Sequence, residues 1–270
     1  MPAGLRLLRR FEFPHKLGVL ERLYGGALEP LGVGWVETSN GVVWKLDLAN
    51  PTHRWIVYGK YEGSAFIDWA REHLPADGTV VDSGANIGQM LLYLATFVTR
   101  GKVLAYEPHP EARAWLEESL ARNTVLPVSI FPLALGARAA DLYLAPRGTT
   151  EHHGAWSQVT ESAEGIPIRV ARLQDELAQL GVKTVDLWKL DVEGYELAAL
   201  EGAEPLLREH AIRAIYAELG FGNGNAIVAH LRERGYRGGL FDRWGRLRPL
   251  RGLPEHTNAL FLPEEIPLER

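Results

Sequence analysis

Apolar and polar residues change their spacing in a regular order along most of the chain. Short apolar runs of strand length alternate with longer segments whose apolar residues recur every three to four positions, as in an amphipathic helix. The predicted strands are 79–82, 102–107, 128–135, 185–191 and 212–219. The predicted helices are 86–98, 109–122, 195–201, 203–210 and 224–234. Strands that alternate with helices predict an α/β domain with a mostly parallel sheet and helices on both faces.

The N-terminal part of the chain follows another pattern. Its predicted elements are a helical lead-in at 1–30, a hairpin of strands 33–37 and 42–48, and a helix at 64–74. Ser39-Asn40-Gly41 supplies a fitting turn for the hairpin. We therefore divide the chain into a helix and β-hairpin extension, 1–75, packed on a core domain, 76–270.

Three further segments complete the predicted architecture. Residues 141–145 are predicted to form an antiparallel strand, and strands near 236–242 and 257–262 predict an antiparallel sheet edge. Residues 146–165 carry glycine, threonine, serine and histidine without a period, which predicts a mobile loop.

Composition excludes several classes of function. The 270 residues contain no cysteine, so neither disulfides nor thiolate metal sites can form. The net charge of −5 disfavours broad nucleic-acid binding, and no run approaches the roughly 18 apolar residues of a membrane span. We expect a cytoplasmic protein with no membrane association. Arginines crowded between 232 and 251 are read as a solvated surface, with a patch for an anionic substrate group as the alternative.

The stretch around 80–107 predicts a nucleoside site. Strand 79–82 leads into a turn that contains Gly84 and Gly88, and a second strand ends at Glu107. Glycine lets the backbone approach a ligand where a Cβ would intrude, and an acidic side chain at this second strand end can accept hydrogen bonds from both ribose hydroxyls.

The glycine spacing favours S-adenosylmethionine over a dinucleotide. A dinucleotide fingerprint needs three glycines as G-x-G-x-x-G, whereas this turn has one wide glycine step. Asp82, on the last strand residue, would repel a pyrophosphate but suits the ammonium end of an amino acid. NAD(P)-dependent oxidation on a Rossmann-like fold and a non-catalytic nucleoside-binding module stay open as alternatives.

Four segments together resemble the FkbM family of S-adenosylmethionine-dependent methyltransferases. They are Gly59-Lys-Tyr61-Glu62, Val81-Asp-Ser-Gly-Ala-Asn-Ile-Gly88, Tyr106-Glu107-Pro108 and Leu190-Asp191-Val-Glu193-Gly194-Tyr-Glu196. The closing Thr257-Asn258-Ala-Leu-Phe-Leu262 also resembles the last strand of that family. The resemblance covers about residues 40–262 and implies a Rossmann-like class I methyltransferase fold with a seven-strand sheet. It also implies methyl transfer, usually to a hydroxyl oxygen of a sugar or other small metabolite.

The expected cofactor residues follow the sheet from the methionine end to the adenine end. They are Glu62, Asp82, Gly84, Ala85, Asn86, Gly88, Glu107, Pro108, Ala134, Leu135 and Asp191. Asn86 is expected to hold the methionine carboxylate or to cap the following helix. The backbone and apolar side chains at the end of strand 128–135 are expected to cradle the adenine, with ordinary core packing as the alternative.

Asp191 and Glu193 are the expected catalytic residues, because they follow a central strand at the crevice where open α/β sheets bind ligands. Asp191 would orient the acceptor and Glu193 would take its proton, and two carboxylates this close should raise one pKa. The alternative is a capping box to which Glu196 contributes.

The acceptor side is expected to include Tyr61, Glu218 and two loop histidines, His152 and His153. Adjacent loop histidines are also typical of a solvated surface, and together with the carboxylates they could hold a divalent metal, although no dense ligand spacing supports one. The expected partner is a small-molecule acceptor, a sugar, glycan or secondary metabolite. We expect no nucleic-acid partner and leave the oligomeric state open, with a homodimer among the options.

Overall fold

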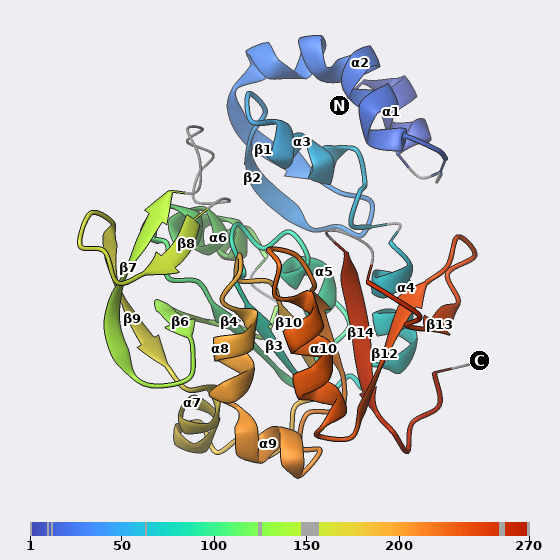
Figure 1. Ribbon diagram of the computed structural model, residues 1–270. Helices are drawn as coiled ribbons and strands as arrows, with labels where there is room; N and C mark the ends of the chain where they lie inside the picture. Colours follow the sequence, from blue (N-terminus) through green and yellow to red (C-terminus); the bar gives the residue numbers. More distant parts are fainter. Residues whose placement is uncertain are drawn as a thin grey trace.

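A computed structural model describes residues 2–9, 11, 13–62, 64–123, 126–146, 157–253 and 257–268. Its largest element is a sheet of eight strands, shown at the centre of Figure 1. In order across the sheet they are β13 (Leu247–Pro249), β12 (Tyr236–Phe241), β14 (Asn258–Pro263), β11 (Ile215–Glu218), β10 (Leu187–Leu190), β3 (Thr79–Ser83), β4 (Lys102–Tyr106) and β5 (Val128–Phe131).

Strand direction confirms the expected Rossmann-like architecture. The five strands from β11 to β5 are parallel, and β14 runs antiparallel between β11 and β12. The sheet has one strand more than the expected seven. The additional strand, β13, pairs with β12 because Asp242 closes a tight turn between them. Its Oδ1 accepts hydrogen bonds from the backbone N–H groups of Trp244, at 2.8 Å, and Arg246, at 3.0 Å.

Helices cover both faces of this sheet, as the alternating pattern predicted. They are α4 (Ala65–His73), from the end of the predicted extension, and α5 (Leu91–Ala95), α6 (Pro110–Arg122), α7 (Leu173–Gln179), α8 (Glu196–Glu201), α9 (Glu204–Arg208) and α10 (Gly224–Arg232) from the core domain. Successive strand residues point to opposite faces. Val80 and Val103 therefore belong to the core with α4, α5 and α6, whereas Val81 and Leu104 belong to the core with α7 to α10.

The predicted helix 86–98 is much shorter in the structure. Only Leu91–Ala95 is helical, because Asn86 and Gly88 have φ angles of 49° and 91°, which no right-handed helix allows. The residues before Leu91 instead form the turn that borders the candidate site.

The predicted strand 128–135 is divided at Pro132 between two sheets. Its second half, β6 (Leu133–Leu135), joins β9 (Ile166–Ala171), β7 (Ala140–Pro146) and β8 (Ser157–Thr160) in a four-stranded sheet. The loop expected at 146–165 is therefore wrong at 157–160, where β8 forms, and its part from 147 to 156 lies outside the described residues. The strand β9 and the helix α7 were not predicted from the hydrophobic spacing.

The N-terminal extension shares the core of the main domain. It contains α1 (Ala3–Leu8), α2 (Lys16–Leu28), the 3₁₀ turn η1 (Glu29–Leu31), the confirmed hairpin β1 (Val33–Glu37) and β2 (Val43–Asp47), and α3 (Pro51–Val57). Figure 1 shows it in blue across the top of the core. Trp44 is fully buried, with its ring centroid 5.5 Å from that of Tyr93, and Asn123 of α6 pairs with both backbone groups of Val43. Within the described residues, no helix has the length and apolar character needed to cross a bilayer.

Candidate cofactor and acceptor site

A cavity of about 470 Å³ opens at the carboxyl ends of the central strands. The chain leaves β3 toward β4 on one side, whereas β10 lies on the other side, so the cavity occupies the topological switch point of the sheet. Nine expected site residues line it: Gly84, Asn86, Glu107, Pro108, Ala134, Leu135, Asp191, Glu193 and Glu218. Its other lining residues are Thr52, Trp55, Lys60, Gln89, Tyr106, His109, Leu144, Ser157, Val159, Val192, Tyr195 and Phe221.

The two glycines of the turn are required by the protein itself. Gly84 has a φ of 76°, and a Cβ built there would lie 1.9 Å from the backbone oxygen of Asp191. A Cβ at Gly88 would lie 2.8 Å from the Cδ1 of Leu116. The close approach that the sequence assigned to a ligand is therefore made to β10 and α6. Gly84 still borders the cavity, whereas Ala85 and Gly88 do not line it.

Glu107 follows β4 and lies at the floor of the cavity, with 6% of its surface exposed. Its Oε2 accepts a hydrogen bond from the backbone N–H of Asn86 at 2.7 Å, and its Oε1 accepts one from His109 at 2.8 Å. Burial raises the pKa of Glu107 to about 7, although these two backbone donors oppose the shift. Each carboxylate oxygen keeps a second lone pair, so the group can still accept hydrogen bonds from a ligand.

The side chain of Asn86 stabilises the turn in which the residue lies. Its Oδ1 accepts a hydrogen bond from the backbone N–H of Ile87 at 2.7 Å, and α5 begins only at Leu91. The expected helix-capping role is therefore wrong, because the residue holds its own left-handed turn. The N-cap of α6 is His109, whose Nδ1 accepts a hydrogen bond from the backbone N–H of Ala112. Glu107 is therefore not the N-cap of this helix.

Asp82 has a protein partner that the sequence did not reveal. The carboxylate is 1% exposed, and its Oδ1 lies 3.1 Å from the Nζ of Lys189 on β10. Lys189 also donates a hydrogen bond to the backbone oxygen of Gly84 at 2.8 Å and lies 3.5 Å from the Oδ2 of Asp191. Burial alone would lower the pKa of Lys189, but the carboxylates of Asp82 and Asp191 raise it. Asp82 does not line the cavity and pairs with Lys189, so its expected contact with a cofactor ammonium stays a prediction.

Glu196 shapes the loop that carries the expected catalytic residues. Its Oε1 accepts hydrogen bonds from the backbone N–H groups of Val192 and Gly194, both at 3.0 Å, and its Oε2 accepts one from Asn223. The alternative of a capping box is wrong, because α8 (Glu196–Glu201) has no side-chain cap and the fully buried Glu196 instead ties the preceding loop together. Asp191 and Glu193 are left to border the cavity, and Glu193 adopts a left-handed φ of 55°.

Glu218 ends β11 beside Asp191. Leu190 pairs with Ala217 in the parallel ladder, so the residues that follow them, Asp191 and Glu218, come next to each other at the strand ends. Burial raises the pKa of Glu218 to about 8, and the neighbouring carboxylates, Asp191 first, add to the shift. The sequence predicted a raised pKa for one carboxyl group of the pair Asp191 and Glu193. In the structure these two carboxylates contribute to the raised pKa of a third group, Glu218.

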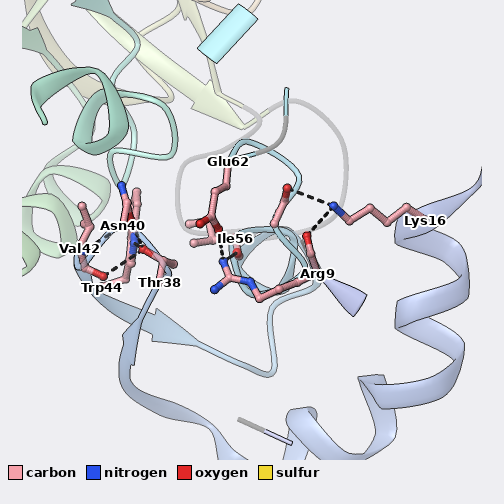
Figure 2. Close-up of polar contacts among 9 residues, drawn as sticks. Arg9, Lys16, Thr38, Asn40, Val42, Trp44, Ile56 and Glu62 are labelled. Carbon is pink, nitrogen blue, oxygen red and sulfur yellow. Dashed lines mark hydrogen bonds and ion pairs between the residues drawn. The ribbon is translucent and has the colours of Figure 1, made fainter. Parts of the chain in front are cut away.

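Tyr61 and Glu62 do not line the cavity. Tyr61 is buried, and the Oε2 of Glu62 accepts a hydrogen bond from Arg9 at 2.7 Å, as Figure 2 shows. In the structure Glu62 makes an ion pair within the extension, and its expected cofactor contact stays a prediction. The same segment instead brings Thr52, Trp55 and Lys60 to the cavity. Lys60 belongs to the motif Gly59-Lys-Tyr61-Glu62 and directly precedes Tyr61. The motif therefore does contain a residue that lines the cavity.

The two histidines expected on the acceptor side, His152 and His153, lie outside the described residues. Among the residues that the structure does describe, no group of three or more histidine, aspartate or glutamate side chains is arranged to hold a metal ion.

Residues 82–237, more than half of the chain, match the sequence profile of the Methyltransferase FkbM domain. The chain belongs to this family. The match confirms the resemblance seen in the sequence motifs and identifies the sheet as that of a Rossmann-like class I methyltransferase. It favours S-adenosylmethionine over the dinucleotide of the oxidoreductase alternative. The matched range begins at Asp82, so the extension lies outside it.

Two fungal proteins are similar to this FkbM chain. Methyltransferase 1 of Beauveria bassiana is 29% identical over 150 residues, which cover 48% of this chain and 60% of that protein. Methyltransferase sdnD of Sordaria araneosa is 29% identical over 162 residues, which cover 49% and 62% of the respective chains. The chain thus spans about three fifths of the length of these relatives.

Solved structures show a weaker likeness. An O-methyltransferase dependent on S-adenosylmethionine from Thermotoga maritima is 17% identical, with a TM-score of 0.41 over 84% of this chain and 76% of that one. An rRNA methylase from Streptococcus thermophilus is 13% identical, with a TM-score of 0.44 over 73% and 93%. The strand order and the family match establish the fold.

Proposed function

We propose that this protein transfers a methyl group from S-adenosylmethionine to a hydroxyl oxygen of a small-molecule acceptor, such as a sugar, a glycan or a secondary metabolite. The observation that carries the proposal is the division of one cavity into two chemically different halves. Glu107 follows β4, whereas Asp191, Glu193 and Glu218 lie at the ends of β10 and β11, on the other side of β3. The apolar Ala134, Leu135 and Leu144 line the same cavity.

The first half fits an adenosine. Glu107 is a buried carboxylate with remaining acceptor capacity, as two ribose hydroxyls require. Ala134, Leu135 and Leu144 offer an apolar surface for the base, and Pro108 completes the wall. When bound, S-adenosylmethionine supplies an electrophilic methyl group on its sulfonium.

The second half fits a hydroxyl acceptor. Asp191 would accept a hydrogen bond from the acceptor hydroxyl and hold its oxygen about 3 Å from the reacting carbon, which is the distance that an in-line displacement needs. Glu193 would take the proton as the oxygen attacks, with Glu218 as the neighbouring carboxyl that tunes its basicity. Trp55 and Phe221 offer ring surfaces for the body of the acceptor. The acidic lining would repel phosphates, which supports a small molecule over a nucleic acid.

The proposal is tested with S-adenosylmethionine labelled on its methyl group and a panel of hydroxylated small molecules. We expect label in an acid-stable methyl ether of at least one sugar or secondary-metabolite acceptor, identified by mass spectrometry and NMR. Transfer to an amine or to RNA, with none to the hydroxylated panel, would contradict the proposed acceptor class. Tight binding of NAD(H) with no affinity for S-adenosylhomocysteine would contradict the whole proposal.

The pH dependence of turnover should report on Glu218. Because its pKa is raised to about 8, the group is mostly protonated at pH 7, and ionisation adds negative charge beside Asp191 and Glu193. That charge makes the cluster a better proton acceptor, so kcat/KM for the acceptor is expected to rise with pH through about 8 and then level off. The measurement uses saturating S-adenosylmethionine, so that ionisation of Glu107, with its pKa of about 7, does not contribute. Glu218→Gln should remove this rise. An unchanged pH profile in that variant, measured with the labelled-methyl assay, would assign the ionisation to another group.

A further inference from the structure

The cavity contains one unusual cation. Lys60 belongs to the N-terminal extension, yet it lines the cavity together with Gly84, Asn86 and Asp191. Within the described part of the chain its ammonium makes no ion pair. The other formally charged lining residues, Glu107, Asp191, Glu193 and Glu218, are all acidic. An anionic group that entered the cavity would therefore find favourable charge at Lys60.

Aromatic side chains hold this cation in place. Its Nζ lies 3.7 Å from the ring centroid of Trp55 and 5.2 Å from that of Tyr61. A cation over an aromatic face is attracted by the ring quadrupole, without being neutralised. Lys60 is exposed, yet partial desolvation by the surrounding protein lowers its pKa, whereas Asp191 acts in the opposite direction. An anionic ligand would therefore stabilise the Lys60 ammonium in this position.

The turn that presents Lys60 is fixed by the first two helices, as Figure 2 shows. The Nη2 of Arg9 donates to Glu62 and to the backbone oxygen of Ile56, at 2.7 and 3.2 Å. The Nζ of Lys16 donates to the backbone oxygens of Arg9, at 2.9 Å, and of Gly59, at 3.4 Å.

Gly59, which precedes Lys60, packs against the same helices. It has a φ of 76°, and a Cβ there would lie 2.7 Å from the backbone oxygen of Arg9. Besides burying apolar surface, the extension therefore fixes the position of Lys60 at the cavity.

We propose that Lys60 binds the α-carboxylate of S-adenosylmethionine, so that the N-terminal extension completes the cofactor site. The inference rests on the proposed function. The sheet order supports it, because Glu107 marks the ribose beyond β4, and the amino-acid end must then extend over β3 and β10 toward Asp191. Lys60 borders the cavity there, and Asp191 is the acid whose charge acts on it. An acidic group on the acceptor is the other possible source of a carboxylate.

Ligand truncation paired with residue truncation tests this assignment. Calorimetry would compare S-adenosylhomocysteine with its decarboxylated analogue, which lacks only the α-carboxylate, on the wild type, Lys60→Met and Lys60→Arg. We expect Lys60→Met to weaken binding of S-adenosylhomocysteine by roughly 10- to 100-fold and to leave the analogue unchanged, since only the charge-assisted contact is lost. Lys60→Arg should recover part of the affinity. Lys102→Met, at the opposite end of β4, is the matched control, and thermal melting checks that each variant is folded.

Two results would overturn the assignment. If the wild type binds S-adenosylhomocysteine and Lys60→Met binds it equally well, Lys60 does not contact the cofactor carboxylate, even where the variant raises the KM of an acidic acceptor. If Lys60→Met weakens both ligands equally, the residue acts on the shape of the cavity and not on the carboxylate. Failure of the wild type to bind either ligand would instead overturn the proposed function, and this inference with it.

Discussion

Asp191→Asn is expected to lower kcat by roughly 10²-fold while S-adenosylhomocysteine still binds, because a small misplacement of the attacking oxygen typically costs that much. The side chain is 36% exposed and borders the cavity, and the Nζ of Lys189 lies 3.5 Å from its Oδ2. Asparagine keeps the shape of the side chain but removes the charge that receives the acceptor hydroxyl. Lys189 keeps Asp82 as a partner, so the variant should fold normally.

The measurement is transfer of labelled methyl, with calorimetry of S-adenosylhomocysteine on the same preparation. Asp175→Asn is the control, because it removes a carboxylate that pairs with Arg172 far from the cavity. Wild-type turnover in Asp191→Asn would show that this carboxylate is not needed, and the catalytic assignment would then move to Glu193 and Glu218.

Lys189→Met is expected to destabilise the fold by about 3–5 kcal/mol, the usual consequence of removing one partner of a buried ion pair. Asp82 is 1% exposed and would be left without a counter-charge, and the backbone oxygen of Gly84 would lose its donor. Urea denaturation measures the loss. An exposed lysine such as Lys102 offers a matched Lys→Met control, for which we expect little change.

A double variant separates the ion pair from simple packing. Asp82→Asn combined with Lys189→Met removes both charges, so it should be more stable than Lys189→Met alone. A double variant that is no more stable than the single one would show that the lysine acts through its packing, and the electrostatic account of the cavity floor would be wrong.

The main features of the fold could be predicted because they depend on local patterns. Apolar runs and helical spacing located the central strands, and carboxylates placed at the carboxyl ends of strands 102–107, 185–191 and 212–219 had to meet at one edge of a parallel sheet. That rule brought Glu107, Asp191 and Glu218 to one cavity without any knowledge of their side-chain contacts.

Long-range pairing limited the rest. Lys189 is a polar residue within the run Leu-Trp-Lys-Leu. Nothing in the local sequence shows that its ammonium pairs with the carboxylate of Asp82 on the neighbouring strand β3. Glu62 similarly pairs with Arg9, which is 53 residues away. Gly84 was correctly identified as a point of close approach, but only the three-dimensional packing shows that the approaching group is the backbone of Asp191.

The second sheet was missed for a different reason. Pro132 lacks a backbone donor, and the apolar run continues on both sides of it, so the change from β5 to β6 leaves no trace in the hydrophobic spacing. The contribution of the extension was missed because Trp55 and Lys60 reach the cavity from α3 and the following turn, which the sequence pattern did not predict.

The central claim is that the cavity at the strand ends binds an adenosyl amino acid through Glu107. Calorimetric titration with S-adenosylhomocysteine tests it most directly, at pH 8, where the carboxyl group, with its pKa of about 7, is mostly ionised. We expect the wild type to bind and Glu107→Ala to bind roughly tens- to hundreds-fold more weakly, since charge-assisted hydrogen bonds to ribose are worth about 1.5–3 kcal/mol. An equal dissociation constant for the two proteins, or no binding by the wild type, would contradict the account.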